Sequence, residues 1–370
     1  MNVAHLIDSG GYYGAEAMLV TLCLEQMASG LSVQVISIGT PGTQLKPLEE
    51  KLIEYNIPYI RWEMLPLPDF RESFKILEYC RKNNVNIIHS HGYKGNILMG
   101  LTPAHRRNIP VITTMHGYTK HKKLSKMAIY QLLDQFCICR LSAVVLVSKS
   151  LESQIPAKKI ANKLHIVENG IQSKEIKSNA PAYVSVFSQK EYKIGSLGRL
   201  SHEKNFSMLI DAFSQVTMNI PQARLVIYGE GPERNNLEDQ IAKLNLKDKV
   251  FLPGYQKQIS AFFNDIDLFI NCSLTEGMPI SILESMKHGC PIVATDIPAN
   301  KTLLAPLNIP GQFCEINPDS LANALIDFYK KTSEERIQLG KRYTELFIQK
   351  YTSEIMCEKY SSIYSLVQTS

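Results

Sequence analysis

The sequence predicts an α/β protein made of two doubly wound domains, each with a parallel sheet covered by helices on both faces. Three observations carry this prediction. Short apolar strands alternate with helix-period segments along the whole chain, as in parallel sheets joined by helical crossovers. The alternation starts again after a polar stretch, residues 172–191. The 370 residues, of which 45% are hydrophobic and 20% charged, are enough for two ordinary globular cores.

The first half contains the elements of one such domain, which we place at residues 1–185. Its candidate strands are short apolar runs: Val3–Ile7, Val33–Ile38, Tyr59–Trp62, Val85–His89, Val111–Met115, Ala143–Val147 and Leu164–Val167. Its candidate helices include Ala15–Met27, Phe70–Lys82 and Leu124–Cys137.

The second half repeats the pattern, and we place this domain at residues 186–345. Its candidate strands are Lys193–Leu197, Arg224–Tyr228, Val250–Leu252, Leu268–Asn271 and Ile292–Thr295. Its candidate helices are Phe206–Met218, Arg234–Leu244, Ile280–His288 and Leu321–Tyr329. A last helix, about Ser353–Val367, lies in the segment 346–370, which we expect to return to the first domain. Because ligands of such sheets bind at the carboxyl ends of the strands, we expect the chemistry in a central cleft that both domains face.

Charge is unevenly distributed along the chain. The net charge is +5, yet residues 1–180 hold 21 Lys and Arg against 14 Asp and Glu, a balance of +7. The remainder holds 19 against 21, a balance of −2. A basic first half suggests an acidic partner or an anionic membrane surface.

One segment concentrates this basic charge. Its lysines are Lys120, Lys122, Lys123 and Lys126. An apolar row accompanies them, made of Leu124, Met127, Tyr130 and Leu133. The pattern predicts an amphipathic helix at an anionic membrane surface, with plain solvated charge as the alternative. Nucleic acid is not expected as a partner, because no interleaved aromatic residues and no known binding motif accompany the charge.

The sequence predicts a cytoplasmic protein, which the basic segment could hold at the inner face of the membrane. No run of eighteen apolar residues occurs, so no membrane span is expected. The first residues lack the basic start and long apolar stretch of a signal peptide. The eight cysteines lie mostly in apolar periodic stretches, as buried reduced thiols do.

The most informative segment runs from Ser273 to Glu284 and contains two glutamates eight positions apart, Glu276 and Glu284. Pro279 suits the first position of a helix, where a missing N–H costs nothing. The segment therefore predicts a strand end, a glycine turn and a helix N-terminus, whose free N–H groups favour an anion. Lys204 lies 72 residues upstream of Glu276 in another loop, and an adjacent cation would suit the same anion.

Four segments, in this order, carry a resemblance to a known family. They are Val167-Glu168-Asn169-Gly170-Ile171, Gly198-Arg199-Leu200 with Lys204, Tyr228-Gly229-Glu230-Gly231-Pro232, and Glu276-x7-Glu284 with Gly-Met-Pro after the first glutamate. The chain resembles family 4 of the retaining glycosyltransferases over nearly its whole length. The resemblance implies the GT-B fold, two Rossmann-like domains facing a central cleft.

The resemblance also implies roles for individual residues. Arg199 and Lys204 would bind the diphosphate of the donor, and Glu284 its ribose hydroxyls. Glu276 and His116 would contact the transferred sugar, which makes the expected catalytic set Arg199, Lys204, Glu276 and His116. The expected donor-binding set is Gly10, Gly11, Gly198, Gly231, Pro253, Tyr255, Gly277, Met278, Pro279 and Glu284. We expect the acceptor near Glu16, His91, Tyr93 and Lys94.

No cofactor or metal ion is expected. Two cations can stabilise a leaving diphosphate, which is the task a metal performs elsewhere. Asp265 and Asp267 could hold a divalent ion, but they precede a strand and lie away from the expected cleft. A zinc site built from His89, His91 and His116 is conceivable, although no second-shell or cysteine pattern supports it.

The sequence therefore predicts a metal-independent retaining glycosyltransferase. It would move a hexose or N-acetylhexosamine from a nucleotide sugar, most simply a UDP-sugar, to a saccharide or lipid-linked acceptor in cell-surface polysaccharide synthesis. A nucleotide-sugar epimerase of the same double fold is one alternative, and a catalytically silent binding protein is another.

Overall fold

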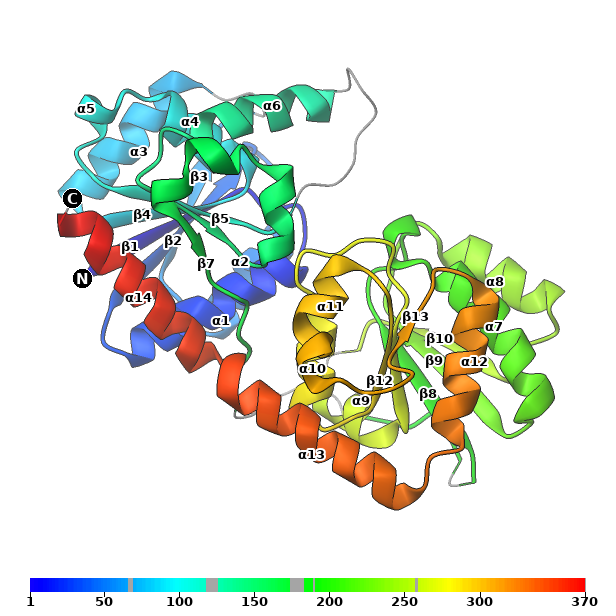
Figure 1. Ribbon diagram of the computed structural model, residues 1–370. Helices are drawn as coiled ribbons and strands as arrows, with labels where there is room; N and C mark the ends of the chain where they lie inside the picture. The colour runs from blue at the N-terminus through cyan, green and yellow to red at the C-terminus, as the bar shows by residue number, and fades with distance from the viewer. Residues whose placement is uncertain (66–68, 118–125, 174–182, 189, 257–258, 370) are drawn as a thin grey trace. The chain divides into compact units, whose positions relative to one another are not determined.

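The computed structural model describes residues 1–65, 69–117, 126–173, 183–188, 190–256 and 259–369 (Figure 1). The chain divides into two compact units, and each is described by itself. Unit 1 comprises Met1–Gln172 together with Thr352–Ser370, and unit 2 comprises Ser173–Tyr351.

Unit 1 is built on a parallel sheet with the strand order β3-β2-β1-β4-β5-β6-β7. The strands are β1 (Asn2–Ile7), β2 (Ser32–Gly39), β3 (Tyr59–Glu63), β4 (Ile87–His91), β5 (Val111–Met115), β6 (Ala143–Leu146) and β7 (Leu164–Ile166). β1 pairs with β2 on one side and with β4 on the other, so the order reverses between β1 and β4. Such a reversal point is where doubly wound sheets bind ligands.

Helices cover both faces of this sheet (Figure 1). They are α1 (Gly14–Ala28), α2 (Pro47–Glu54), α3 (Phe70–Lys82), α4 (Tyr93–Leu101), α5 (Ala104–Arg107), α6 (Lys126–Ile138) and α14 (Ser353–Thr369). Short 3-10 turns occupy Lys149–Gln154, Ala157–Lys159 and Ala161–Lys163.

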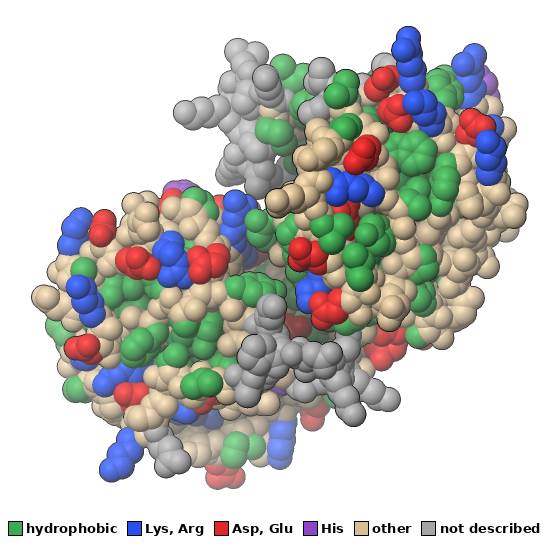
Figure 2. Space-filling model, turned by 180° about the vertical axis from the view of Figure 1, so that it is seen from behind, with side chains coloured by type: hydrophobic (Ala, Val, Ile, Leu, Met, Phe, Trp, Pro, Cys, Tyr) green, Lys and Arg blue, Asp and Glu red, His purple; other side chains and the backbone are tan. Residues whose placement is uncertain are grey.

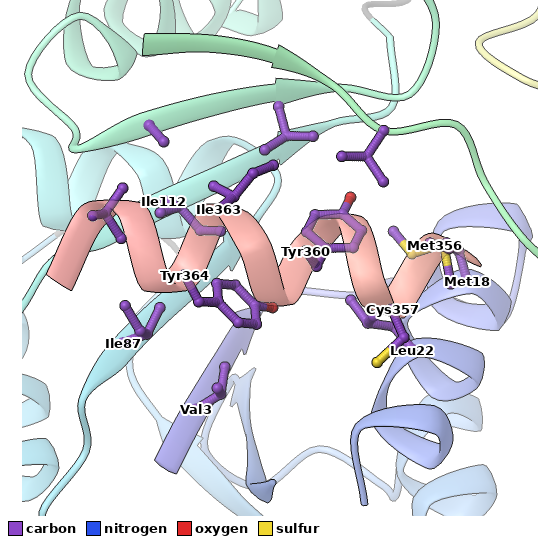
Figure 3. Packing of buried hydrophobic residues seen from close by; sticks show 14 residues of the cluster. Val3, Met18, Leu22, Ile87, Ile112, Met356, Cys357, Tyr360, Ile363 and Tyr364 are labelled. Atoms are coloured by element: carbon purple, nitrogen blue, oxygen red, sulfur yellow. The ribbon is translucent and has the colours of Figure 1, made fainter. Parts of the chain in front are cut away.

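The terminal helix α14 completes the core of unit 1. Its buried Met356, Tyr360 and Tyr364 pack over Val3 of β1 and Ile87 of β4 (Figure 3). Burial of side chains of this size is worth roughly 1.5–3 kcal/mol each. The last residues of the chain therefore stabilise the first domain.

Unit 2 is built on a second parallel sheet with the order β10-β9-β8-β11-β12-β13. Its strands are β8 (Tyr192–Leu197), β9 (Ala223–Tyr228), β10 (Val250–Gly254), β11 (Leu268–Asn271), β12 (Ile292–Thr295) and β13 (Phe313–Cys314). Its helices are α7 (Phe206–Asn219), α8 (Arg234–Lys243), α9 (Ile259–Asp265), α10 (Ile280–Lys287), α11 (Pro298–Leu304), α12 (Pro318–Tyr329) and α13 (Ser333–Lys350), with 3-10 turns at His202–Lys204 and Ala305–Leu307.

The predicted fold class, two doubly wound parallel-sheet domains, is confirmed. The predicted strand Val85–His89 is displaced along the chain: β4 runs from Ile87 to His91, and Ile7 of β1 pairs with His91. The predicted helix Leu124–Cys137 corresponds to α6, which begins at Lys126, and residues 124–125 lie outside the described part of the chain.

The units divide at Gln172/Ser173 and Tyr351/Thr352, whereas the sequence placed the divisions at 185/186 and 345/346. Hydrogen bonds explain the first difference. The Tyr183 hydroxyl donates to a carboxylate oxygen of Asp265 at 2.8 Å, and the Ser185 hydroxyl donates to the same oxygen at 2.5 Å, which attaches this segment to unit 2. The second difference arises because α13, which ends at Lys350, packs against α10 of unit 2.

Acidic and basic side chains lie interspersed on the face drawn in Figure 2, with apolar side chains between them. Among the helices the structure describes, none is long and apolar enough to cross a bilayer.

Candidate functional site

The carboxyl ends of four neighbouring strands form one edge of the unit 2 sheet. The strands are β10, β9, β8 and β11, and the order reverses between β8 and β11. The loop after β8 contains Lys204, and the loop after β11 contains Glu276. The sheet thus brings together two loops that are 72 residues apart in the sequence.

Lys204 and Glu276 form an ion pair at this edge. The Nζ atom of Lys204 lies 2.6 Å from Oε1 of Glu276, and the two side chains are 22% and 12% exposed. The same Oε1 atom accepts a hydrogen bond from the Ser273 hydroxyl at 2.7 Å. A charge-assisted bond in this half-buried position holds both side chains in one geometry.

Backbone contacts fix the two loops to each other. The amide of Leu274 donates to the carbonyl of Glu203 at 2.8 Å, and the Cys272 thiol donates to the carbonyl of Lys204 at 3.1 Å. The hydroxyl of Thr295 donates to the carbonyl of Ser273 at 2.6 Å. Hydrogen bonds to the backbone of the two loops therefore hold Lys204 and Glu276 close to each other.

Glycines line the adjoining strand ends because the backbones there approach one another closely. A Cβ atom on Gly229 would lie 1.8 Å from the carbonyl oxygen of Gly198, and one on Gly231 would lie 2.2 Å from the carbonyl oxygen of Leu200. Gly229 also has a φ of +149°, which favours glycine. Only glycine fits at these two positions, so the loops lie flat against each other.

The remaining predicted donor residues of the β11 loop lie around the start of α10. Met278 and Pro279 are buried, Gly277 is half-buried, and Glu284 is half-buried in the second turn of the helix. Pro279 has an extended ψ of 110° and caps the helix, which begins at Ile280, so the expectation of Pro279 as the first helical residue was wrong by one position. A helix start in this position still presents the positive end of the helix dipole, which suits an anion.

Three further predicted residues lie on neighbouring loops. Arg199, directly after β8, is exposed. Pro253 near the end of β10 and Tyr255 just after it are exposed too, Tyr255 by 62%. The sequence did not single out Arg234, whose guanidinium binds both oxygens of Glu230 at 2.7 and 2.8 Å and so braces the β9 loop.

Unit 1 contains a cavity of about 400 Å³ at the carboxyl edge of its sheet, around the point where the strand order reverses. Its lining includes five residues that the sequence singled out: Glu16, His91, Tyr93, Lys94 and His116. Asp8, Met127, Tyr130 and Asp134 also line it. The expected acceptor residues and His116 are therefore neighbours in one domain.

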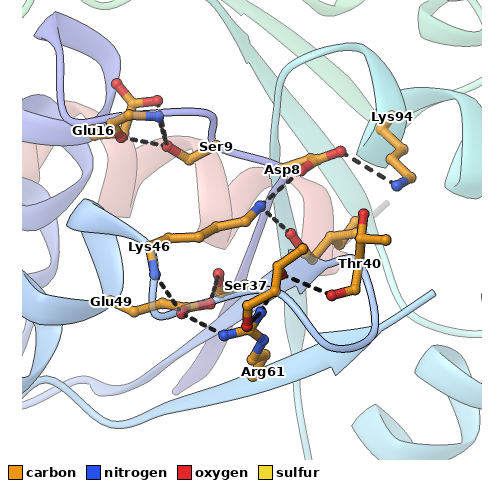
Figure 4. A network of polar contacts seen from close by, with 12 residues as sticks. Asp8, Ser9, Glu16, Ser37, Thr40, Lys46, Glu49, Arg61 and Lys94 are labelled. Carbon is orange, nitrogen blue, oxygen red and sulfur yellow. Dashed lines mark hydrogen bonds and ion pairs between the residues drawn. The ribbon is translucent and has the colours of Figure 1, made fainter. Parts of the chain in front are cut away.

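The glycine-rich loop after β1 is held by its own side chains. One carboxylate oxygen of Glu16 accepts from the Ser9 hydroxyl at 2.8 Å (Figure 4). The other accepts from the amide of Tyr13 at 3.0 Å. Gly11 donates its amide to the Ser9 hydroxyl at 3.2 Å, and no atom lies within 4 Å of a Cβ built on Gly10. Glu16 caps α1 and lines the cavity at the same time.

Asp8 pairs with two lysines beside this loop, which the sequence did not predict. Its carboxylate lies 3.0 Å from Lys46 Nζ and 3.3 Å from Lys94 Nζ (Figure 4). Lys46 comes from the start of α2 and Lys94 from the start of α4. The charge of Lys94, a predicted acceptor ligand, is thus compensated within the protein.

Three buried histidines share one face of the sheet below the cavity. His5 of β1 is paired in register with His89 of β4, and His91 lies two residues further along. Burial lowers the pKa of His5 to about 4 and holds the pKa values of His89 and His91 well below the ordinary range. Burial also lowers the pKa of His116 to about 4. These imidazoles are neutral at pH 7.

The histidines His5, His89 and His91 could each offer a nitrogen within 4.8 Å of the others, a spacing that would suit a metal ion. Hydrogen bonds already use both ring nitrogens of His5 and of His89. The zinc combination of His89, His91 and His116, which the sequence did not favour, is not among the possible metal-binding groups of the described residues. The ring centres of His91 and His116 are 6.1 Å apart.

The two aspartates before β11 have structural partners. A carboxylate oxygen of Asp265 also accepts a hydrogen bond from Nζ of Lys193 at 2.6 Å, and one of Asp267 accepts from the backbone amide of Lys193 at 2.8 Å. They lie at the amino end of β11, at the opposite edge from Lys204 and Glu276. Their carboxylates tie β8, β11 and the chain entering unit 2 together.

The basic segment lies mostly outside the described residues: Lys120, Lys122 and Lys123 are not described, and Lys126 begins α6. The apolar row expected on this helix was wrong in part, because Met127 and Tyr130 line the cavity of unit 1. The most exposed apolar side chains of α6 are Ile129, Leu132 and Phe136, at 60%, 68% and 54% exposure, none of which belonged to the expected row. Met127 lines the cavity and is still 40% exposed.

Comparison with known proteins gives relatives over most of the chain. The chain is 26% identical over 293 residues to the UDP-Gal:alpha-D-GlcNAc-diphosphoundecaprenol alpha-1,3-galactosyltransferase of Escherichia coli, covering 75% of each chain. It is 22% identical over 375 residues to the N-acetyl-alpha-D-glucosaminyl L-malate synthase of Bacillus anthracis, covering 95% of this chain and 93% of the relative.

The fold is shared with solved structures. The crystal structure of Anabaena HepE in complex with UDP superposes with a TM-score of 0.80 at 18% identity, covering 99% of this chain and 100% of the other. The sucrose-phosphate synthase of Thermosynechococcus elongatus superposes with a TM-score of 0.78 at 18% identity, covering 100% and 99%.

Two family descriptions match consecutive parts of the sequence. Residues 12–175 match "Glycosyltransferase Family 4", and residues 182–345 match "Glycosyl transferases group 1". These ranges correspond to the two sheets of the structure, and the relatives are named as glycosyltransferases. The chain belongs to the family 4, group 1 glycosyltransferases with the GT-B fold.

Proposed function

We propose that this glycosyltransferase moves a hexose or N-acetylhexosamine from a UDP-sugar to a saccharide or lipid-linked acceptor, with retention of the anomeric configuration. The observation that carries the proposal is the half-buried Lys204–Glu276 pair at the reversal point of the unit 2 sheet, beside a glycine-lined edge and the start of α10. A fixed cation, a helix start and a flat backbone together suit a diphosphate.

The donor nucleotide binds to unit 2 in this proposal. Lys204 and Arg199 contact the diphosphate, and the amides at Gly277 and Met278 add hydrogen bonds. Glu284, half-buried in the second turn of α10, accepts two ribose hydroxyls. UDP as the leaving group is supported by the UDP complex of Anabaena HepE and by the UDP-Gal named for the Escherichia coli relative.

The reaction needs positive charge where the diphosphate departs. The bond between the anomeric carbon and the phosphate oxygen breaks, the acceptor oxygen bonds to the same carbon, and its proton passes to the departing phosphate. Lys204 and Arg199 stabilise the negative charge that develops, each bond being worth roughly 1.5–3 kcal/mol. We therefore propose that no divalent ion is required.

The acceptor binds to unit 1. Its cavity of about 400 Å³ has room for a sugar ring and is lined by the predicted residues Glu16, His91, Tyr93 and Lys94. His116 lines the same cavity and contacts the transferred sugar in this proposal. A role in cell-surface polysaccharide synthesis is supported by relatives named for O-antigen biosynthesis in Escherichia coli.

We also propose that α6 attaches the protein to an anionic membrane surface. Ile129, Leu132 and Phe136 form one exposed apolar row at helical spacing, and the guanidinium of Arg140 lies 5.6 Å from the centre of the Phe136 ring. Apolar side chains flanked by cations favour the boundary of an anionic bilayer.

A donor screen with the purified full chain tests the proposed function. Calorimetry with UDP, GDP and ADP should give the tightest binding for UDP, and binding should persist in EDTA. Release of free UDP from a UDP-sugar should depend on an added saccharide acceptor. Loss of UDP binding in EDTA contradicts the metal-free proposal. Conversion of the sugar without release of UDP would instead indicate an epimerase.

A further inference from the structure

A single chain of hydrogen bonds runs from the cavity of unit 1 to the terminal helix. It links His91, His5, Gln26, Tyr364, His89, Thr114 and Tyr360. Every neighbouring pair is 2.8 Å apart except His91 and His5, which are 3.0 Å apart. All seven side chains are at most 3% exposed. The hydroxyl groups of Tyr360 and Tyr364 extend from α14 toward the sheet (Figure 3).

Gln26 divides the chain of hydrogen bonds into two branches, one through His5 to His91 and the other through Tyr364 and His89 to Thr114 and Tyr360. The orientation of the Gln26 amide sets the direction of the first branch. Its Nε2 atom donates to the Tyr364 hydroxyl, so its Oε1 atom accepts from Nε2 of His5. His5 is neutral, because burial keeps its pKa near 4, and its Nδ1 atom is therefore an acceptor. The partner of Nδ1 is Nε2 of His91, which must carry the hydrogen.

The other branch runs the opposite way from the same amide. The Tyr364 hydroxyl, already accepting from Gln26, donates to Nδ1 of His89. His89 is neutral too and donates from Nε2 to the Thr114 hydroxyl, which donates to Tyr360. All six bonds are thus satisfied with one consistent set of donors, as a buried network requires.

The tautomer of His91 follows from this chain. Because Nε2 carries the hydrogen and the ring is neutral, Nδ1 holds a bare lone pair. This Nδ1 atom is buried and has no hydrogen-bond partner among the described residues, and His91 lines the cavity. An acceptor atom left in this state is unfavourable unless a ligand or water supplies a donor.

The lining of the cavity is acidic. Asp8, Glu16 and Asp134 contribute carboxylates, against the ammonium group of Lys94, which pairs with Asp8. Nε2 of His116 is a second buried ring nitrogen without a partner in the described chain. Because carboxylates outnumber the cation in this lining and the bare Nδ1 atom of His91 is an acceptor, the cavity favours a hydroxyl donor and disfavours an anion.

We propose that the unit 1 cavity binds an uncharged sugar or polyol, one hydroxyl of which donates to Nδ1 of His91, and that His5 and Gln26 are positioning residues that hold His91 in this tautomer. The proposal rests on the proposed function, since it names the chemical class of the acceptor end that enters this cavity. A phosphate or carboxylate of the acceptor must then lie elsewhere.

Nitrogen NMR of the ¹⁵N-histidine-labelled full chain tests the tautomer without donor or activity. We expect the His91 signal, assigned with His91→Gln, to report a protonated Nε2 and an unprotonated Nδ1 at pH 7. Gln26→Met removes the bonds from Gln26 to His5 and to Tyr364 and should give a mixture of His91 tautomers. Tyr360→Phe, the matched control, removes only the terminal bond to Thr114 and should leave His91 unchanged. A protonated Nδ1 of His91 in the unaltered protein overturns the proposal.

The ligand class is tested by titrating the same sample with methyl α-glucoside and with glucuronic acid. The neutral glucoside should shift the Nδ1 signal of His91, and the anionic sugar should bind at least about tenfold more weakly. Equal or tighter binding of glucuronic acid, or no shift with the glucoside, overturns the proposal. Calorimetry with UDP on the same sample reports the donor site separately, so failure here is distinguishable from failure of the proposed function.

Discussion

Gly229 lies against the main chain of Gly198 so closely that a Cβ atom on Gly229 would be 1.8 Å from the Gly198 carbonyl oxygen. The two residues directly follow neighbouring strands, β9 and β8, at the edge where we propose that the diphosphate binds. A side chain at this position has to separate the two loops.

Replacement of Gly229 by Ala should therefore lower the free energy of unfolding by about 2 kcal/mol or more, because the contact is with backbone and the residue has a positive φ. Urea unfolding measures the change. Gly10→Ala is the matched control, since a Cβ there meets no atom within 4 Å, and it should shift stability by less than about 0.5 kcal/mol. Equal stability of both variants would contradict the close approach.

Replacement of Lys204 by Ala should reduce turnover by about 10²–10³-fold, because it removes a fixed positive charge from the proposed leaving-group site. Release of UDP in the presence of acceptor measures the effect, and circular dichroism should show an unchanged fold. Lys243→Ala, at an exposed lysine of α8, is the control and should retain full activity. Unchanged activity of the Lys204→Ala variant would contradict the proposal that Lys204 binds the diphosphate of the donor.

Stability should fall as the pH is lowered from 7 toward 4. The pKa of buried His5 is lowered to about 4, against 6.5 for an ordinary histidine, so the unfolded chain binds the proton more readily in this range. This difference in pKa corresponds to a loss of on the order of 3 kcal/mol in the free energy of unfolding for His5. The lowered pKa values of His89 and His91 act in the same direction. Urea titrations at a series of pH values measure it.

The control for this pH dependence is His105→Gln, because His105 is exposed on α5. This variant should keep the full loss of stability at low pH. A free energy of unfolding that stays constant between pH 7 and 5 would mean that the histidines below the cavity are not buried as neutral groups.

Replacement of Leu132 by Glu should weaken binding to anionic vesicles, because Leu132 is 68% exposed in the middle of the apolar row of α6. Co-sedimentation with vesicles of phosphatidylglycerol, compared with phosphatidylcholine, measures binding, which should also fall with salt. Leu244→Glu, at a leucine 37% exposed at the end of α8, should bind like the unaltered protein. Equal binding to both lipids would contradict the membrane proposal.

Much of the fold could be predicted from the sequence because apolar periodicity marks each strand and helix. The candidate site could be predicted for the same reason. Once the strand ends are known, Lys204 and Glu276 must lie at the carboxyl edge of one sheet, and His91 and His116 at that of the other. The loops that carry these residues follow directly from the strand order.

Contacts set by side-chain packing could not be predicted. Nothing near Asp8 in the sequence indicates its pairing with Lys46, which depends on how α2 packs. The chain of bonds through Gln26 depends on Tyr364, 338 positions away, and no local pattern links the two. The apolar row of α6 was misassigned because the helix is apolar on more than one side, so the periodicity did not identify the face toward the cavity.

The placement of α14 in unit 1 has a consequence for synthesis of the protein. A ribosome releases the β1 and β4 segments early, yet the helix that covers Val3 and Ile87 is synthesised only after all of Ser173–Tyr351. Until α14 emerges, the nascent first domain carries an uncovered apolar surface, the kind of surface that chaperones bind. A chain truncated at Lys350 would therefore contain nearly all of unit 2 and an unfinished unit 1.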